Sequence, residues 1–145
     1  IRNKVILLRN PKSIRPWQLV LEPLKGYLIL AKKQFENPLK YSGAWNFGTD
    51  LKSKTDVEQI VKYMINFWGK GRMKKIKNKN FYEHLLLQID PTKAKRKLGW
   101  SPTYNMKNTV KITTQWYLDV LKNKKNPLEV TNQQIENYMI RNGWY

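Results

Sequence analysis

The strongest constraint on the fold comes from residues 21–35, where apolar side chains cover more than one face of a helix. The apolar stripe consists of Leu24, Tyr27, Leu28, Ala31 and Phe35, and it is widened by Leu21, Ile29 and Leu30. The first five recur at helical spacing, and Pro23 falls in the first turn, where its missing N–H does no harm. We therefore predict a helix that needs cover on more than one side and that exposes an apolar patch where this cover is absent.

The length and the missing cysteines narrow the class of protein. A chain of 145 residues, 41% of them hydrophobic, suits one compact domain. It has no cysteine and a single histidine, His84, so disulfides, thiolate catalysis and the common zinc sites are excluded, and we expect no metal site. No apolar run approaches the roughly 20 residues of a membrane span, and no signal-peptide pattern is present. We expect a cytoplasmic protein without a membrane partner.

The charge balance raises a second hypothesis. The chain has 28 basic and 10 acidic residues, a formal net charge of +18, and such an excess is typical of nucleic-acid-binding modules. Of the basic residues 22 are Lys and 6 are Arg, and the chain contains 14 Asn, which indicates a compositional bias. Arg would be favoured for reading phosphates. We keep a basic nucleic-acid-binding module as the alternative function but disfavour it, and we predict that the densest stretch, Lys70–Lys79, is a solvated loop.

The rest of the chain is predicted to form short strands and further helices. Apolar runs predict strands at residues 4–9, 44–48 and 85–89. Four further helices are predicted from residues that favour a helix start or end. The first starts at Thr55 with Glu58 and ends at Gly69, and the second starts at Asp90 and ends at Gly99. The third starts at Asn105, and the last starts at Thr131 with Gln134 and ends at Gly143. The prediction is an α/β fold in which helices outweigh a few short strands, and residues 1–145 form a single unit.

Sequence motifs for catalysis and for cofactor binding are missing. The nearest approach to a dinucleotide-binding loop, residues 69–72, follows a helix instead of joining a strand to a helix. The chain contains no phosphate-binding Gly-Lys loop, no nucleophile elbow and no Tyr followed four positions later by Lys. We predict that this chain holds no catalytic residue and binds no cofactor by itself.

Several motifs carry a family resemblance. They are Ile14-Arg15-Pro16-Trp17-Gln18, Glu22-Pro23-Leu24, Ala44 to Gly48, Asp90-Pro91-Thr92-Lys93-Ala94, Leu98-Gly99-Trp100 and Thr114 to Tyr117. In this order and spacing they resemble the C-terminal part of extended short-chain dehydrogenase/reductases that act on nucleotide sugars, and in particular CDP-glucose 4,6-dehydratases. The resemblance implies a Rossmann-type parent whose NAD-binding half is absent here.

The resemblance also implies a function for the parent enzyme. Such a lyase uses NAD to oxidise the sugar, eliminate water and return the hydride, so that CDP-glucose becomes CDP-4-keto-6-deoxyglucose. The family's NAD site and catalytic residues precede a position like Ile1, so this chain would be a substrate-binding fragment, inactive alone. Its implied partners are CDP-glucose or a related nucleotide sugar and the missing Rossmann domain, on which residues 17–36 would pack. A related sugar-nucleotide epimerase/dehydratase and a homo-oligomer are left open.

The same resemblance assigns candidate binding residues. Arg15 matches an arginine that contacts the substrate diphosphate, and a guanidinium can bind such oxygens with two parallel hydrogen bonds. Residues Ile6, Leu7 and Leu8 match a strand along the base, and Glu83 matches a carboxylate near the sugar. The alternatives without a binding function are that Arg15 pairs only with a carboxylate such as Glu22, and that Glu83 is a loop residue facing lysines.

Overall fold

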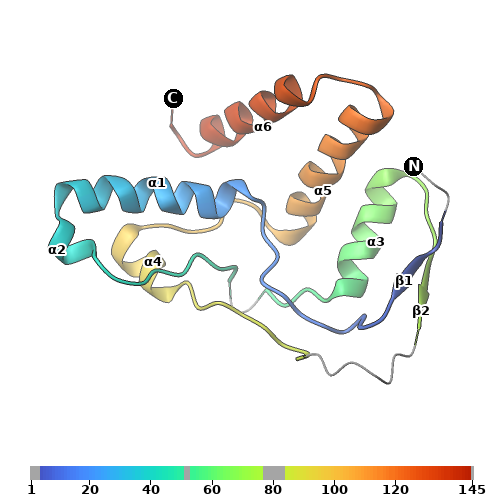
Figure 1. Cartoon of the computed structure of the whole chain (residues 1–145), viewed down its shortest axis with the longest axis horizontal. Coiled ribbons are helices and arrows are strands. Elements are labelled where there is room, and N and C mark those ends of the chain that lie inside the picture. Colours follow the sequence, from blue (N-terminus) through green and yellow to red (C-terminus); the bar gives the residue numbers. More distant parts are fainter. Residues whose placement is uncertain (1–3, 51–52, 77–83, 145) are drawn as a thin grey trace.

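The computed structural model describes residues 4–50, 53–76 and 84–144, which form a mostly helical domain with one two-stranded sheet (Figure 1). The elements in chain order are β1 (Ile6–Leu8), α1 (Leu21–Glu36), α2 (Pro38–Tyr41), α3 (Val57–Trp68), β2 (Met73–Lys75), α4 (Thr92–Leu98), α5 (Met106–Tyr117), the π-helical turn η1 (Leu118–Lys122) and α6 (Pro127–Arg141). β1 and β2 pair in parallel, with Leu7 opposite Lys74. The predicted mixture of helices and short strands is confirmed at this level.

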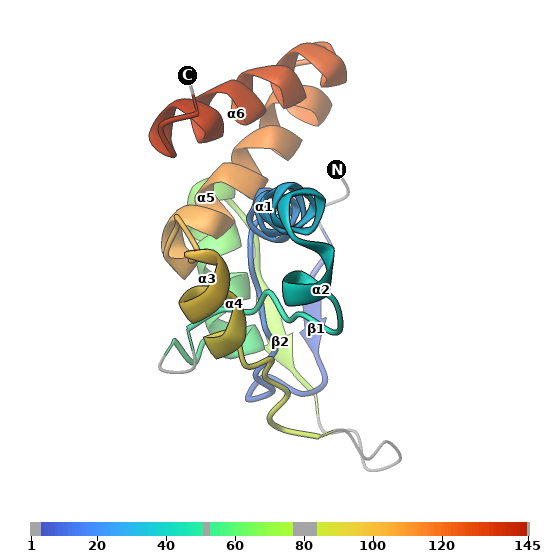
Figure 2. The same ribbon diagram turned by 90° about the vertical axis from the view of Figure 1, so that its left-hand side faces the viewer.

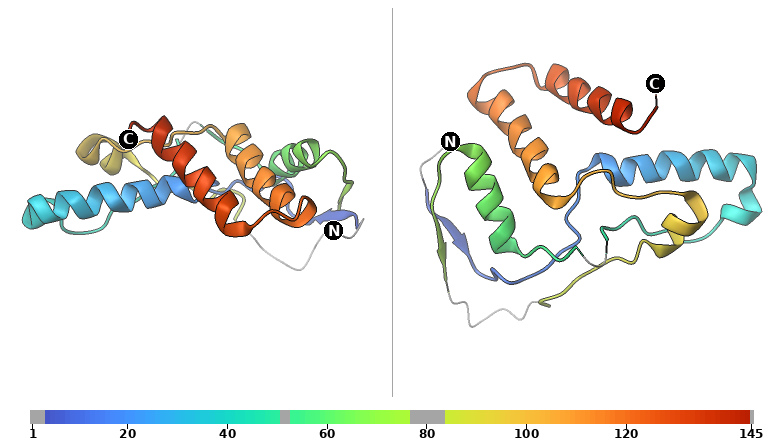
Figure 3. Two further views of the ribbon diagram at one scale, coloured as in Figure 1. Left: turned by 90° about the horizontal axis from the view of Figure 1, so that it is seen from above. Right: turned by 180° about the vertical axis from the view of Figure 1, so that it is seen from behind.

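The helices form two groups, which are joined by the contact of α5 with α6. Figure 2 looks along α1 and shows α2 and α4 below it and α6 above. The second group contains α3 and α5, which pack side by side next to the sheet (Figure 1). The two further views show α6 returning from η1, so that the C-terminal end of α6 lies near the start of α1 (Figure 3).

A small aromatic core joins α1 to α4. Phe47, Ala94, Leu98 and Trp100 are buried together, and the rings of Phe47 and Trp100 meet edge to face at 5.2 Å. Gly26 lies directly against the Phe47 ring, because a Cβ built on Gly26 would overlap the ring carbons. The glycine therefore permits the close approach of α1 to residue 47.

Several helix signals are confirmed and two are corrected. Asn105 caps α5 by accepting a hydrogen bond from Asn108 N at 2.9 Å, and Gly69 and Gly99 end α3 and α4 with positive φ. Asp56, not Thr55, caps α3, because its Oδ1 accepts from Gln59 N at 2.8 Å. The helix predicted to start at Thr131 begins four residues earlier, at Pro127, and is capped by Asn126.

Two predicted strands are wrong and one predicted loop contains a strand. Residues 44–48 have no strand partner, and Phe47 O accepts a side-chain hydrogen bond from Gln18 instead. In 85–89 only Leu86 makes an isolated bridge, with Ile14, so this segment forms no regular strand among the described residues. The stretch expected to be a solvated loop contains β2, because residues 73–75 complete the hydrogen bonding of β1.

No helix in the described part of the chain combines the length and the apolar character needed to cross a membrane.

The predicted apolar patch on α1 is present. Val20, Leu24, Tyr27, Leu28 and Phe35 are all exposed, with Leu24 at 45% and Leu28 at 60% of their full surface.

Candidate functional site

Arg15 lies at a point where three segments meet. The carbonyls of Pro11 and Ser13 accept hydrogen bonds from the first amides of α3, at 2.9 Å from Glu58 N and 3.0 Å from Val57 N. The next residue, Ile14, bonds through its amide to Leu85 O at 2.7 Å and through its carbonyl to Leu87 N at 3.1 Å. The backbone before Arg15 is thus held between the start of α3 and residues 85–87.

The guanidinium of Arg15 is half-buried and bonded to two backbone carbonyls. Its Nη1 donates to Ile14 O at 2.8 Å and to His84 O at 3.0 Å. The carboxylate of Glu22 is bound by other groups, described below, so the alternative that Arg15 pairs with Glu22 is not observed. The geometry holds the Arg15 side chain in a defined direction without a carboxylate from α1.

The other predicted binding residues are placed differently. Ile6 and Leu7 in β1 are exposed and Leu8 is buried, so the strand presents two of its three side chains to solvent. Glu83 lies outside the described residues. The contacts assigned to Ile6, Leu7, Leu8 and Glu83 stay predictions.

A buried polar network at the start of α1 was not foreseen. Glu22 is only 1% exposed, and its carboxylate accepts hydrogen bonds from Thr103 N at 2.9 and 3.0 Å, from Tyr104 N at 3.0 Å and from the Tyr138 hydroxyl at 2.6 Å. Burial and the bond to the Glu22 carboxylate raise the pKa of Tyr138 well above its ordinary value. The network therefore ties α6 to α1 through a neutral phenol and a carboxylate.

Lys25 extends the same network. Its Nζ donates to Ser101 O, to the Thr103 hydroxyl and to Asn142 Oδ1, each at 2.9 Å. Burial lowers the pKa of Lys25, and the charge of Glu22 partly opposes this shift. The only sequence signal for this network is that Glu22 and Lys25 are the charged residues of the otherwise apolar stretch 21–31, the first part of α1.

A second buried carboxylate, that of Glu58, forms ion pairs with lysines beside the sheet. Glu58, near the start of α3, is 2.9 Å from both Lys62 Nζ and Lys75 Nζ and 3.7 Å from Lys12 Nζ. Hydrogen bonds from Lys75 and Lys62 lower the pKa of Glu58 to about 2. The cluster joins β2, α3 and the turn before Arg15, so part of the basic excess has a structural role.

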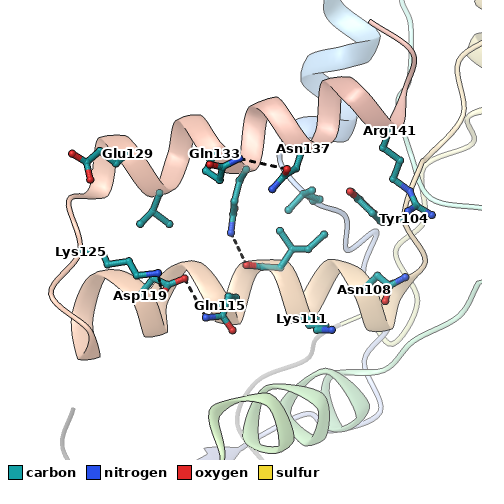
Figure 4. A pocket seen from close by; sticks show the side chains of 14 residues that line it. Tyr104, Asn108, Lys111, Gln115, Asp119, Lys125, Glu129, Gln133, Asn137 and Arg141 are labelled. Atoms are coloured by element: carbon teal, nitrogen blue, oxygen red, sulfur yellow. Dashed lines mark hydrogen bonds and ion pairs between the residues drawn. The ribbon is translucent and has the colours of Figure 1, made fainter. Parts of the chain in front are cut away.

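Two cavities lie along α5 and α6, and Arg15 lines neither of them. The larger, of about 620 Å³, is bounded by both helices and is shown in Figure 4. The smaller, of about 450 Å³, lies where residues 18–21 meet the same helices. No site of three or more His, Asp or Glu residues suitable for a metal occurs among the described residues.

The residues present do not fit a dinucleotide. A pyrophosphate site needs a glycine-rich turn that leads from a strand into a helix. In this chain the connections from β1 to α1 and from β2 to α4 contain no glycine, and Gly69 and Gly71 lead from a helix into a strand. No NAD site is therefore built from the described residues.

A search of curated proteins relates the chain to a dehydratase. No family model matches the chain. The chain is 34% identical over 138 residues to the CDP-glucose 4,6-dehydratase of Salmonella typhimurium, and the match covers 94% of this chain but 38% of that protein. The chain is thus a partial homologue of a dehydratase, and it spans well under half of its relative's length.

Proposed function

We propose that this chain is the nucleotide-sugar-binding portion of an NAD-dependent CDP-glucose 4,6-dehydratase and is inactive alone. The observation that carries the proposal is the match of 34% identity, which runs through 94% of the chain to a protein of that name. The absence of an NAD-binding turn in the described residues agrees with substrate binding by this chain and NAD binding by another part of the enzyme. On this proposal the glycine-rich site and the reacting groups belong to the part of the relative that the match does not cover.

Arg15 is the residue we assign to the diphosphate. A guanidinium binds phosphate oxygens with charge-assisted hydrogen bonds, and its specificity depends on a fixed orientation. The bonds from Nη1 to Ile14 O and His84 O supply this orientation, and the hydrogen bonds of Ile14 to Leu85 and Leu87 hold the backbone. On the proposal the anchored side chain meets the diphosphate of CDP-glucose, and the exposed side chains of Ile6 and Leu7 lie along the base.

The apolar face of α1 is the surface we assign to the NAD-binding part of the enzyme. Residues 17–36 include Val20 just before α1 and Leu24 and Leu28 on α1, and all three stay exposed in the described structure. An exposed apolar patch on a helix marks an interaction surface. The full enzyme, with NAD bound by its other portion, would bury this face.

Isothermal titration calorimetry tests the proposal. CDP-glucose and CDP are titrated into the wild-type chain, into Arg15→Gln and into Arg96→Gln. The control variant, on α4, removes the same charge from an exposed site. We expect binding to the wild type and to Arg96→Gln and at least a tenfold weaker affinity for Arg15→Gln. Equal affinity for all three proteins overturns the role of Arg15, and no heat with either ligand at millimolar concentration overturns binding by this chain.

The alternative of nucleic-acid binding gains little from the structure. Lys25 is buried, Lys62 and Lys75 surround Glu58, and Lys93 lies 4.1 Å from the Trp45 ring centroid. These lysines have structural partners instead of forming a bare phosphate-binding surface. Affinity for duplex or single-stranded DNA that falls log-linearly with salt concentration would favour the alternative.

A further inference from the structure

The turn at residues 10–13, which leads from β1 toward Arg15, forms part of the cap of α3. A helix begins with amides that have no partner within the helix. The first two amides of α3 donate to Ser13 O at 3.0 Å and to Pro11 O at 2.9 Å, and the third donates to the Asp56 carboxylate at 2.8 Å. The 10–13 turn and the start of α3 therefore hold each other in place, next to the sheet (Figure 1).

Side chains reinforce this contact through one buried carboxylate. Glu58 is 7% exposed, and its carboxylate lies 3.7 Å from Lys12 Nζ in the turn and 2.9 Å from Lys75 Nζ in β2. Lys75 stands opposite Leu8, the last residue of β1, after which the chain enters the turn. Because Glu58 is buried, its attraction to these ammonium groups is weakened by water less than that of an exposed ion pair. Glu58 thus joins α3 to the turn on one side and to the sheet on the other.

The backbone between the turn and Arg15 has little freedom. Ser13, whose carbonyl caps α3, is 1% exposed, and Ile14 is bonded through its amide and its carbonyl to residues 85–87. Only Ile14 separates Ser13 from Arg15. A shift of the 10–13 turn away from α3 would therefore move Arg15 and disturb the bonds of its Nη1 to Ile14 O and His84 O.

We infer that Glu58 is the positioning residue of the Arg15 site, because its carboxylate holds the 10–13 turn against α3 and β2 and thereby fixes the direction in which Arg15 meets a diphosphate. The inference rests on the proposed function, since it concerns the same site. A guanidinium recognises two phosphate oxygens through its orientation, and a group that is held in its bound orientation loses less entropy on binding. Glu58 contributes to affinity through Arg15, without a contact to the ligand.

The sign of the effect separates positioning from simple electrostatics. Glu58→Gln removes a negative charge from a basic protein, so electrostatics alone would strengthen the binding of an anionic ligand. Loss of positioning weakens it instead. A purely structural role would weaken ligands with and without phosphate alike, and its effect would add to the loss of Arg15. The three explanations therefore differ in sign, in ligand dependence and in additivity.

Nuclear magnetic resonance titration of the ¹⁵N-labelled chain with CDP and with cytidine tests the inference. The variants are Glu58→Gln, Arg15→Gln, their double variant and Glu36→Gln, a matched change at an exposed carboxylate of α1. We expect Glu58→Gln to weaken CDP binding at least fivefold, to leave cytidine binding unchanged and to have no further effect when Arg15 is already replaced. Glu36→Gln should bind CDP as the wild type does. Equal or tighter CDP binding by Glu58→Gln, an equal loss for cytidine, or additive losses overturns the inference.

A measurement without ligand distinguishes failure of this inference from failure of the proposed function. ¹⁵N relaxation at Arg15 Nε reports how well this side chain is ordered. We expect its order parameter to fall in Glu58→Gln and to stay unchanged in Glu36→Gln. An unchanged order parameter in Glu58→Gln overturns the positioning role, whether or not CDP binds. A fall in the order parameter, together with no CDP binding by the wild type, supports the positioning of Arg15 and overturns the proposed function.

Two exposed lysines give a second route, since Glu58→Gln changes a buried position. Lys12→Gln removes the ion pairs that join the 10–13 turn to Glu58 and to Asp56. The matched variant, Lys62→Gln, removes a lysine 2.9 Å from Glu58 that lies on the same helix and does not contact the turn through this pair. We expect the order parameter of Arg15 Nε to fall in Lys12→Gln only. Equal values in the two variants contradict the role of the turn contact.

Discussion

Replacing Glu22 with glutamine removes a charge from the most buried carboxylate described in this chain. The carboxylate accepts hydrogen bonds from two backbone amides and from the Tyr138 hydroxyl. The amide of Gln keeps one acceptor oxygen and turns an NH₂ group toward a donor. A hydrogen bond to a charged group contributes about 1.5–3 kcal/mol, and removing one member of a buried charged pair costs about 3–5 kcal/mol. Lys25 loses its favourable neighbour at the same time, so we expect a loss near the upper figure.

This loss is large for a domain of this size. Small domains have unfolding free energies of about 5–15 kcal/mol. With a urea m-value of about 2 kcal/mol per molar, a loss near 5 kcal/mol should lower the unfolding midpoint of Glu22→Gln by about 2.5 M. The assay is urea unfolding followed by circular dichroism and by tryptophan fluorescence, since Trp100 is buried and donates to Glu22 O at 3.0 Å.

The control is Glu36→Gln at the end of α1, where the carboxylate is exposed and pairs with Lys33 at 2.9 Å. Its midpoint should change little, because exposed ion pairs contribute little. In the double variant Glu22→Gln/Tyr138→Phe, the combined loss should be smaller than the sum of the single losses, because both changes remove the same bond. The reasoning is refuted if Glu22→Gln shifts the midpoint no further than Glu36→Gln does.

Three further outcomes are expected. Gly26→Ala should lower the melting temperature, because overlap with the Phe47 ring costs about 1–3 kcal/mol and outweighs a gain in helix propensity of about 1 kcal/mol; a higher melting temperature would contradict this packing. The folded-state pKa of Glu58, about 2, lies below its ordinary value of 4.5, so its contribution to stability is present above pH 4.5 and is lost as the pH falls toward 2. Melting at a series of pH values should therefore show a shallower acid loss for Glu58→Gln than for the wild type, and parallel curves would refute the role of the lysines. Leu24→Gln/Leu28→Gln should reduce self-association in light scattering, and unchanged particle size would argue against an adhesive α1 face.

Signals that act within a few residues were predictable. Gly69 and Gly99 end helices because a left-handed residue is needed there and glycine adopts it at little cost. Asn105 caps α5 because its side chain reaches an amide three residues on. Asp90 was expected to cap α4, but the N-cap residue is Pro91; Asp90 lies one position earlier, where its Oδ1 accepts from Thr92 N at 2.9 Å.

Signals that need a distant partner were not predictable. The apolar residues 85–89 read as a strand, but a strand exists only where another segment offers a continuous ladder, and here Ile14 provides a single bridge. Thr131 and Gln134 have the spacing of a capping box, yet their side chains bond to Trp116 and Ile112 on α5. The same polar groups serve a cap or a tertiary cross-link, and spacing does not distinguish these uses.

The amino-acid sequence alone determined the order of the main helices, the wide apolar face of α1 and the lack of a dinucleotide turn, since each depends on residue type and short-range spacing. Arg15 as the candidate for a diphosphate rests on the family resemblance. Tertiary structure alone decided that Glu22 and Lys25 are buried, that Glu22 does not pair with Arg15, and that α5 and α6 border two cavities. The physical reason is that burial and pairing of a charged side chain depend on which segments enclose it. Glu22 is enclosed by residues about 80 and 116 positions further along the chain.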